Sequence, residues 1–443
     1  MRIIDADQFD EYWKTQSGSC GSDLAVDSVV REIIEAVRGE GDAALRRYAA
    51  RFDKSSPEQL EVPRSMADDA WEELCRTENE LSLALELAAG HIRRFADLQR
   101  KQFVDFEAEI DRGLITGQRV IPVERAAVYV PAGRFPLFSS VLMGMIPALA
   151  AGVEEIILAS PPMEDGFPDR RILAAAALSM GTKAGLRIFA MGGAQAIAAL
   201  ALGAGSVPRA SVIVGPGNKY VAAAKRLLFG EVGIDFVAGP TDVLVIAAAS
   251  AGAEAELIAA DMLAQAEHDP DSKARALVPD RAMAETIHAA LKEQLAALPE
   301  ESRTTAAASL DAGGLIVVYK SREDAIRIAN IIAPEHLELH MENTNAWIDR
   351  NQDSCLKNYG SLFIGSLAAE VLGDYSAGIN HTLPTSGGAR FSGGLSVRHF
   401  LKTVTTLRCV PGPGFEAARK AAEILGQAEG LIAHAHASLV RRV

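Results

Sequence analysis

The chain has 443 residues, of which 49% are hydrophobic and 23% are charged, and its formal net charge is −14. This length predicts two or more domains, because single hydrophobic cores stop growing well below this size. The acidic balance argues against a nucleic-acid binder, which would normally present a basic face. It does not exclude anionic substrates, since a local pocket can differ in sign from the whole molecule.

Cysteine usage and the N-terminus indicate the compartment. Cys20, Cys75, Cys355 and Cys409 are widely spaced and form no CxxC pair, which favours a reducing compartment over a disulfide framework. No basic segment followed by an apolar run opens the chain, so no signal peptide is expected. The most apolar stretch, 141–159, is interrupted by glycine, proline and two glutamates, which is too broken for a membrane span. We therefore expect a cytoplasmic protein.

Helical periodicity dominates the first hundred or so residues, and an alternating pattern follows. Apolar spacing predicts helices over 27–38, from 42, and over 78–102. Short apolar runs then predict strands, and the stretches between them predict helices. The first block has strands at 126–130, 153–159, 185–190 and 211–214, with helices at 140–151, 170–180, 194–202 and from 219. This alternation predicts a parallel sheet with helices on its faces.

A second alternating block completes the expected α/β fold. Its strands are expected at 243–246, 274–278, 314–319 and 361–365, with helices at 254–267, 282–298 and 322–332. After about residue 394 we expect a helix, a break at the Pro-Gly-Pro-Gly of 411–414 and a final helix to 438. The sequence thus predicts two α/β units with parallel sheets, a helical N-terminal region and a helical C-terminal tail.

Two glycine-rich loops lie between a strand end and a helix start, where phosphates bind in α/β proteins. They are Gly192-Gly-Ala-Gln195 and Gly215-Pro-Gly-Asn218. For either loop taken alone, turn chemistry and helix capping are the favoured explanation. Because two such loops occur in one sheet, a ligand site and a pair of simple turns are about equally good interpretations.

Gln265 and His268 lie three residues apart, so on a helix they share one face and form half of a metal site. Later fragments with polar or ionisable side chains offer to complete it; they contain Glu335-His336, Asp374 with His381, and Glu429 with His434. A nitrogen and oxygen set of this kind suits zinc, with cobalt or manganese as substitutes. For each residue taken singly, a surface amide, a structural histidine or a turn cap is the favoured explanation.

Glu335 and His336 follow Pro334, which ends the expected helix over 322–332, so both are expected in a loop or at a new helix start. A carboxylate beside an imidazole can divide two proton transfers between them. A surface ion pair or a helix cap is the structural alternative.

The chain resembles the histidinol dehydrogenase family nearly from end to end. The densest matching motifs are Tyr129-Val-Pro-Ala-Gly133, Gly192-Gly-Ala-Gln-Ala-Ile-Ala-Ala-Leu200, Val214-Gly-Pro-Gly-Asn218, Gln265-Ala-Glu-His268, Pro334-Glu-His-Leu337, Gly373-Asp-Tyr375 and Asn380-His-Thr-Leu-Pro-Thr385. The resemblance implies a homodimer of intertwined subunits, each with two incomplete Rossmann-like domains, that uses NAD and one zinc ion per active site.

The same resemblance implies roles for individual residues. Zinc would be held by Gln265, His268 and Asp374, with His434 from the neighbouring subunit. Tyr129, Gln195 and Asn218 would contact NAD. Glu335 and His336 would be the acid–base residues. The substrate pocket would comprise Thr241, His336, His381 and Glu429 together with the four zinc ligands.

Domain roles follow from this assignment. Residues 1–25 would form an N-terminal arm, and 26–125 with 240–390 a first α/β domain carrying most zinc and acid–base residues. Residues 126–239 would form a second, NAD-binding α/β domain, and 391–443 a helical tail swapped onto the partner subunit.

The implied reaction is a four-electron oxidation of an alcohol to a carboxylate through a bound aldehyde, with L-histidinol as the leading substrate and L-histidine as the product. The alternatives are a paralogue that oxidises another small polar alcohol, such as 2,3-dihydroxypropane-1-sulfonate, and an inactive metabolite-binding homologue. Departures from the usual family pattern bear on this choice; they are Ala132, Thr241, Asp242, Ala247 and Ile379. The role of His436 is left open.

Overall fold

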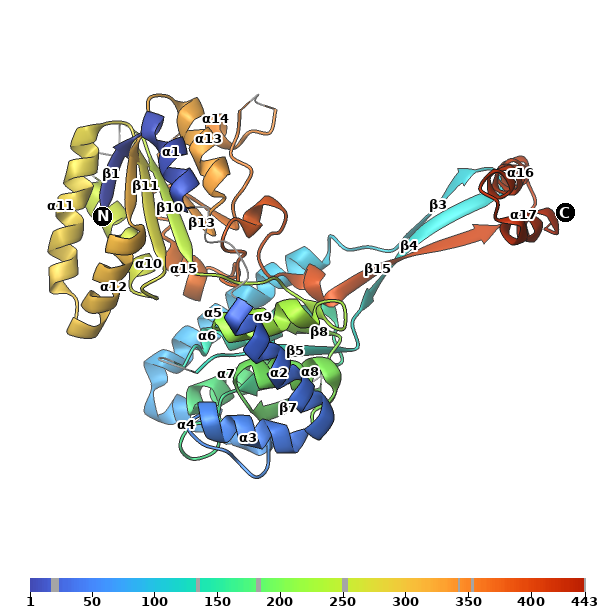
Figure 1. Ribbon diagram of the computed structural model, residues 1–443, viewed down its shortest axis with the longest axis horizontal. Coiled ribbons are helices and arrows are strands. Elements are labelled where there is room, and N and C mark those ends of the chain that lie inside the picture. Colours follow the sequence, from blue (N-terminus) through green and yellow to red (C-terminus); the bar gives the residue numbers. More distant parts are fainter. Residues whose placement is uncertain are drawn as a thin grey trace.

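The computed structural model describes residues 1–16, 24–132, 136–180, 185–248, 254–341, 343–351 and 354–441. Cys20 and Gly133 lie outside these ranges. The chain forms two α/β units and a long arm that ends in a pair of helices (Figure 1). The predicted fold class, two α/β units with parallel sheets, is confirmed.

The first unit is built on a six-stranded sheet of order β2-β7-β6-β5-β8-β9, in which only β2 is antiparallel. Its strands are β2 (Glu61–Val62), β5 (Arg125–Tyr129), β6 (Glu155–Ser160), β7 (Gly185–Ala190), β8 (Val212–Val214) and β9 (Gly233–Ile234). The helices that alternate with them are α6 (Ser139–Ala151), α7 (Arg170–Met180), α8 (Gly193–Leu202) and α9 (Lys219–Leu228). Chain order reverses at β5, because β6 pairs on one side of it and β8 on the other.

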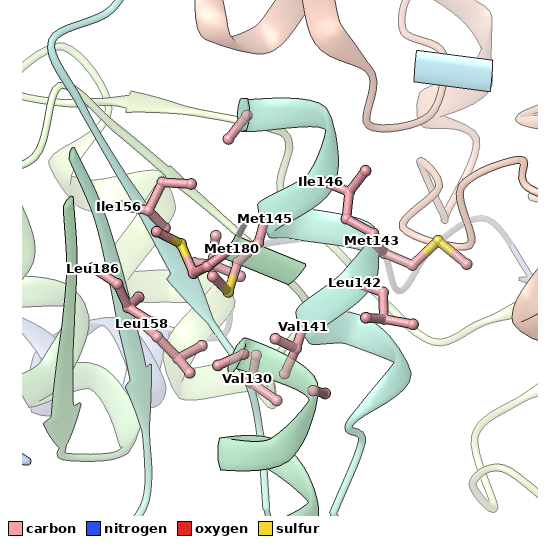
Figure 2. Packing of buried hydrophobic residues seen from close by; sticks show 14 of the residues in the cluster. Val130, Val141, Leu142, Met143, Met145, Ile146, Ile156, Leu158, Met180 and Leu186 are labelled. Carbon is pink, nitrogen blue, oxygen red and sulfur yellow. The ribbon is translucent and has the colours of Figure 1, made fainter. Parts of the chain in front are cut away.

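Helix α6 packs closely on this sheet. Val141 and Met145 share one apolar cluster with Ile156 and Leu158 of β6 (Figure 2). A Cβ atom at Gly144 would lie 2.4 Å from a methyl group of Val128, so the glycine permits this approach. The helix that begins just beyond the carboxyl end of β5 is thereby fixed in position.

Four earlier helices also cover the first unit: α2 (Leu24–Glu40), α3 (Asp42–Phe52), α4 (Arg64–Thr77) and α5 (Asn79–Arg100). The apolar residues of α2 and α3 cluster with those of α8 and α9, and those of α4 and α5 cluster with α6 and α7. The expected grouping of 26–125 with 240–390 therefore differs from the structure. Amphipathic periodicity reveals that a helix has an apolar face but not which sheet covers it.

The second unit is an all-parallel sheet of order β1-β12-β11-β10-β13-β14. Its strands are β1 (Arg2–Asp5), β10 (Asp242–Ala247), β11 (Lys273–Val278), β12 (Leu315–Val318), β13 (His336–His340) and β14 (Ser361–Ile364). Helices α10 (Ala255–Ala266), α11 (Arg281–Ala297) and α12 (Glu300–Gly313) cover one face, and α1 (Ala6–Gln16), α13 (Arg322–Ile332) and α14 (Asn345–Ile348) the other. Helix α15 (Glu370–Tyr375) follows β14.

Two expectations for this unit are corrected. The first residues form an edge strand, since Arg2–Asp5 pair with Leu315–Val318, so they are part of the sheet and not a separate arm. His336 begins strand β13, between β10 and β14, and lies neither in a loop nor in a helix. The polar side chains of His336, Glu338 and His340 hide the apolar run by which a buried strand is usually recognised.

The arm is a three-stranded antiparallel sheet of order β15-β4-β3. It contains β3 (Phe106–Asp111), β4 (Leu114–Pro122) and β15 (Leu401–Cys409), and its outer end carries α16 (Pro413–Ala428) and α17 (Ile432–Leu439). Short 3-10 turns at Gly388–Arg390 and Val397–Phe400 precede β15. The helix expected from about residue 394 is therefore wrong as far as Cys409, where the run Thr403-Val-Thr-Thr406 favours a strand. The break at Pro411 is confirmed, and two helices follow it where one was expected.

Within the described ranges, Cys75, Cys355 and Cys409 are free thiols. No helix in that part of the chain is long and apolar enough to cross a membrane.

Candidate active site

Strand β13 carries three ionisable residues on one face. Side chains alternate along a strand, so His336, Glu338 and His340 point to one side, whereas Leu337 and Leu339 pack in the apolar cluster on the other. The chain reaches β13 through Ala333, whose φ of 51° ends helix α13. This turn places Glu335 directly ahead of the strand.

Glu335 is 5% exposed, and its side chain is held at the start of β10. Its Oε2 accepts hydrogen bonds from Thr241 Oγ1 at 2.5 Å and from the backbone N–H of Asp242 at 3.1 Å. Burial raises the pKa of Glu335 to about 7, although the His336 imidazole and the Thr241 hydroxyl act in the opposite direction. Glu335 therefore exchanges protons near neutral pH.

His336 is 3% exposed, and neither ring nitrogen has a hydrogen-bond partner among the described residues. Its Nδ1 lies 4.0 Å from Glu335 Oε2 and 3.8 Å from Glu370 Oε2, and its Nε2 lies 3.5 Å from Asp374 Oδ1. Burial opposes the charged ring, but Glu335, Asp374 and Glu370 together raise the pKa of His336 to about 10. Phe363 covers the ring, with centroids 5.9 Å apart.

Asp242 fixes the backbone that carries this pair. Its Oδ1 accepts from the Glu335 backbone N–H at 3.1 Å, and its Oδ2 accepts from Arg275 Nη1 at 3.0 Å. Asp242 was noted in the sequence only as a departure from the family pattern. The structure shows that its carboxylate ties β10, β11 and the start of β13 together.

Gln265 and Asp374 each approach the Glu335–His336 pair, Gln265 through Thr241 and Asp374 through His336. Gln265, 1% exposed, donates from Nε2 to Thr241 Oγ1 at 2.7 Å, which leaves its carbonyl oxygen available to a cation. Burial alone would raise the pKa of Asp374, but the imidazoles of His336, His381 and His268 lower it. His268 is exposed and lies in the turn after α10, which ends at Ala266, so it does not share a helical face with Gln265.

The donor set fits zinc. An amide oxygen, an ionised carboxylate and an imidazole near that carboxylate are ligands that zinc accepts. Within one chain these are three of the four expected ligands. His268 is close enough to Asp374 to lower its pKa, and the binding of one metal ion by Gln265, His268 and Asp374 together stays a prediction.

His381 joins the two α/β units. Its Nδ1 is hydrogen-bonded to the Asp374 carbonyl at 2.8 Å, and its Nε2 to Ser140 Oγ of α6 at 3.1 Å. The neighbouring Asn380 donates to the carbonyl of Met143 at 2.8 Å. Since α6 begins beyond the carboxyl end of β5, the amino ends of β10 and β13 face the carboxyl edge of the first sheet.

The candidate NAD residues lie at that carboxyl edge. Tyr129, at the end of β5, accepts a hydrogen bond on its hydroxyl from the Gly193 N–H at 3.1 Å. Gly215 has a φ of 115°, and a Cβ there would lie 2.1 Å from the Tyr129 carbonyl oxygen. The loops after β5, β7 and β8 therefore meet, as a dinucleotide site in an α/β sheet requires.

The amides of this region are already in use within the chain. Asn218 caps α9, because its Oδ1 accepts from the backbone N–H groups of Tyr220 and Val221. Gln195, 2% exposed, donates from Nε2 to Asp53 at 3.5 Å. Burial raises the pKa of Asp53 to about 6 and that of Tyr129 to about 12. The backbone N–H groups of Gly193 and Gly215 are likewise paired, with the Tyr129 hydroxyl and the Asp235 carboxylate.

Glu429 and His434 are not brought to this site within one chain. Glu429 ends α16, His434 lies on α17 with His436, and all three are exposed. Figure 1 shows both helices at the outer end of the arm, separated from β13 and α15. The remaining family departures are structural: Ala132 and Ala247 are buried, and Ile379 lies against Gly373.

Several residues near the site were not singled out from the sequence; they are Asp261, Glu338, His340 and Glu370. All four are buried. Two patterns mark them: the alternation His336-x-Glu338-x-His340, and the four-residue spacing of Asp261 to Gln265 and of Glu370 to Asp374. Those spacings place the new residues beside the expected ones on one strand face and two helices.

The fold and this site define an α/β enzyme with a buried carboxylate–imidazole pair at the junction of two sheets. The chain belongs to the histidinol dehydrogenase family, whose model matches residues 19–442. The crystal structure of histidinol dehydrogenase from Elizabethkingia anophelis superposes with a TM-score of 0.88 at 35% identity, covering 99% of this chain and 97% of that one.

Relatives identified by sequence belong to the same family. Histidinol dehydrogenase of Thermus thermophilus is 46% identical over 422 residues, which are 95% of each chain. That of Prochlorococcus marinus is 44% identical over 415 residues, covering 94% of this chain and 89% of that protein. A protein named histidinol dehydrogenase homolog from Ruegeria pomeroyi is 42% identical over 413 residues, 93% of this chain and 92% of that protein.

Proposed function

We propose that this chain is a zinc-dependent, NAD-linked dehydrogenase that oxidises L-histidinol to L-histidine through a bound aldehyde, in histidine biosynthesis. The observation that carries the proposal is the environment of His336: a buried imidazole without hydrogen-bond partners in the described chain, between the carboxylates of Glu335, Glu370 and Asp374. Family membership supplies the substrate class.

The neutral form of His336 accepts the proton of the substrate hydroxyl in the first half of the reaction. Because the surrounding carboxylates raise the pKa of His336 to about 10, we expect this step to become faster as the pH rises toward that value. The three surrounding carboxylates stabilise the imidazolium that forms, which favours this transfer. Glu335, whose pKa is about 7, takes the proton of the water that adds to the aldehyde. Thr241 and the Asp242 N–H hold its carboxylate in place for that step.

Gln265, His268 and Asp374 hold zinc, and the loops around Tyr129, Gln195 and Asn218 hold NAD. When bound, the metal polarises and positions the substrate, and the dinucleotide accepts hydride. His381, hydrogen-bonded to Ser140 and to the Asp374 carbonyl, would contact the substrate between the two units. The methyl group of Thr241 would contact the substrate as well.

The site is completed by a second copy of the chain. Exposed apolar side chains on the arm and its helices include Ile110, Leu407, Leu425 and Ile432, which are 61–67% exposed. Leu367 and Phe391, near α15, are 90% and 87% exposed. Apolar groups exposed on this scale mark interaction surfaces. In a homodimer the partner's α16–α17 pair would cover this region and supply His434 and Glu429 to the zinc and substrate. We place this dimer in the cytoplasm, as the cysteine usage suggests.

NADH formation by zinc-loaded protein tests the proposal. L-Histidinol and 2,3-dihydroxypropane-1-sulfonate are supplied separately, and the expected result is turnover of histidinol with about two NADH per histidine formed. Turnover of the sulfonate alone would replace histidinol with another polar alcohol. NAD binding without turnover of either would indicate a metabolite-binding protein.

A further inference from the structure

A second cluster of metal-ligating side chains lies further along β13. His340 Nε2 is 3.4 Å from Glu338 Oε2 and 3.5 Å from Asp261 Oδ2. One ligand atom from each of the three residues lies within 4.8 Å of the others. All three residues are buried, and both Glu338 and His340 are 1% exposed.

The separations between these atoms fit ligands of one ion better than a hydrogen-bonded group. A charge-assisted hydrogen bond would draw the atoms to about 2.7–2.9 Å. Two ligands of a tetrahedral zinc ion, each about 2.0–2.1 Å from the metal, lie roughly 3.3–3.4 Å apart. Glu338 Oε2 has no hydrogen-bond partner in the described part of the chain, and a buried, unpaired carboxylate oxygen is costly unless it binds a cation.

Outer contacts orient the ligand atoms. Glu254 Oε2 lies 3.5 Å behind His340, on its Nδ1 side. Glu338 Oε1 accepts the backbone N–H of Glu370 at 2.7 Å, which leaves Oε2 directed at His340. The hydrogen bond to the second carboxylate oxygen of Glu338 is a support that metal ligands usually have, whereas Glu254 lies near His340 without a hydrogen bond to it.

Charge also calls for a cation. The carboxylates of Asp261, Glu338 and Glu254 form ion pairs only with His340 among the residues described. The competing arrangement is a protonated His340: burial disfavours it, but Asp261 and Glu338 raise the pKa of His340 to about 9. A single proton on His340 would offset one carboxylate charge, whereas a divalent ion would offset two.

We propose that Asp261, Glu338 and His340 bind a divalent metal ion, zinc or manganese, at a structural site separate from the zinc held by Gln265, His268 and Asp374. The ion would tie together the elements that carry the catalytic groups. Asp261 lies one helical turn before Gln265 on α10, and Glu338 holds the first residue of α15, which carries Asp374 one turn later.

Metal analysis of the full chain tests this site independently of the proposed activity. Protein loaded with zinc, or with manganese, is desalted and its metal content measured by mass spectrometry. We expect about two equivalents per chain in the wild type, and about one in His340→Gln, in Glu338→Gln and in Asp374→Ala. The double variant His340→Gln with Asp374→Ala should retain none.

His288→Gln is the matched control. His288 lies on α11, and its Nδ1 also lacks a hydrogen-bond partner within the described ranges; this variant should keep both equivalents. Circular dichroism verifies that each variant is folded. If His340→Gln does not fold, Glu338→Gln is used in its place. One equivalent in the wild type that persists in His340→Gln and Glu338→Gln would overturn the proposal. One equivalent lost with His340→Gln but kept in Asp374→Ala would support it and reject the zinc assignment instead.

Discussion

The hydroxyl of Thr241 donates a hydrogen bond of 2.5 Å to the buried carboxylate of Glu335. The hydroxyl oxygen of Thr241 also accepts a hydrogen bond from the side-chain amide of Gln265 at 2.7 Å. One side chain therefore orients both a proton-transfer group and a proposed zinc ligand. The relationship explains why a hydroxyl is needed at this position, and it links the acid–base and metal functions physically.

Removing that hydroxyl will shift the pH dependence of the enzyme. The Thr241 hydrogen bond lowers the pKa of Glu335, so Thr241→Ala should raise it and move the acidic limb of the pH–rate profile to higher pH. Loss of a hydrogen bond to a charged group costs about 1.5–3 kcal/mol, or roughly 10-fold to 100-fold in kcat. Thr241→Ser keeps the hydroxyl and should keep most activity. Superimposable profiles for the alanine and serine variants would contradict this role.

Glu335→Gln will slow the second oxidation more than the first. The carboxylate is needed to accept a proton from water, whereas His336 remains to accept the hydroxyl proton. Rates measured separately with histidinol and with the aldehyde should show the larger loss for the aldehyde. Equal losses would remove Glu335 from water activation.

The same variant should gain stability at alkaline pH. The folded-state pKa of Glu335 is about 7 and its ordinary value is 4.5. The free energy that the protonated side chain contributes to folding is therefore complete below pH 4.5 and is lost as the pH rises through 7. The shift corresponds to about 3 kcal/mol. Chemical denaturation should show Glu335→Gln more stable than the wild type at pH 8 and no more stable at pH 4.5. A difference independent of pH would indicate another cause.

Asp374→Ala will lose activity together with one metal equivalent. Its carboxylate stays ionised beside His336, His381 and His268, as a zinc ligand must. Asp271→Ala, which removes an exposed carboxylate in the turn after α10, is the control and should retain both metal and activity. Full metal content in Asp374→Ala would show that zinc is held elsewhere.

Much of the fold could be predicted because its strands are short apolar runs between glycine-rich turns. Strands β5, β6, β7, β10 and β11 lie within a few residues of their predicted positions. Strand β13 was missed because three of its five residues are ionisable. Strand β15 was missed because it is largely exposed and has no buried face to produce an apolar alternation.

The site was only partly predictable for a related reason. Glu335 and His336 are adjacent in sequence, so their proximity needed no tertiary information. Asp242 and Glu370 approach them through register between strands and through the placement of α15, which sequence spacing does not encode. His434 depends on assembly, because its helix lies at the end of the arm.

Mixed dimers test the central claim, an active site built by His336 of one subunit and His434 of the other. Chains carrying His336→Ala and His434→Ala are co-expressed with different tags, and doubly tagged dimers are purified. One of the two sites then has both histidines, so about half the wild-type rate is expected. Dimers of wild-type chain with the double variant His336→Ala and His434→Ala should be inactive, because each site lacks one histidine. An inactive first dimer and a half-active second would contradict the account, since the site would then lie within a single chain.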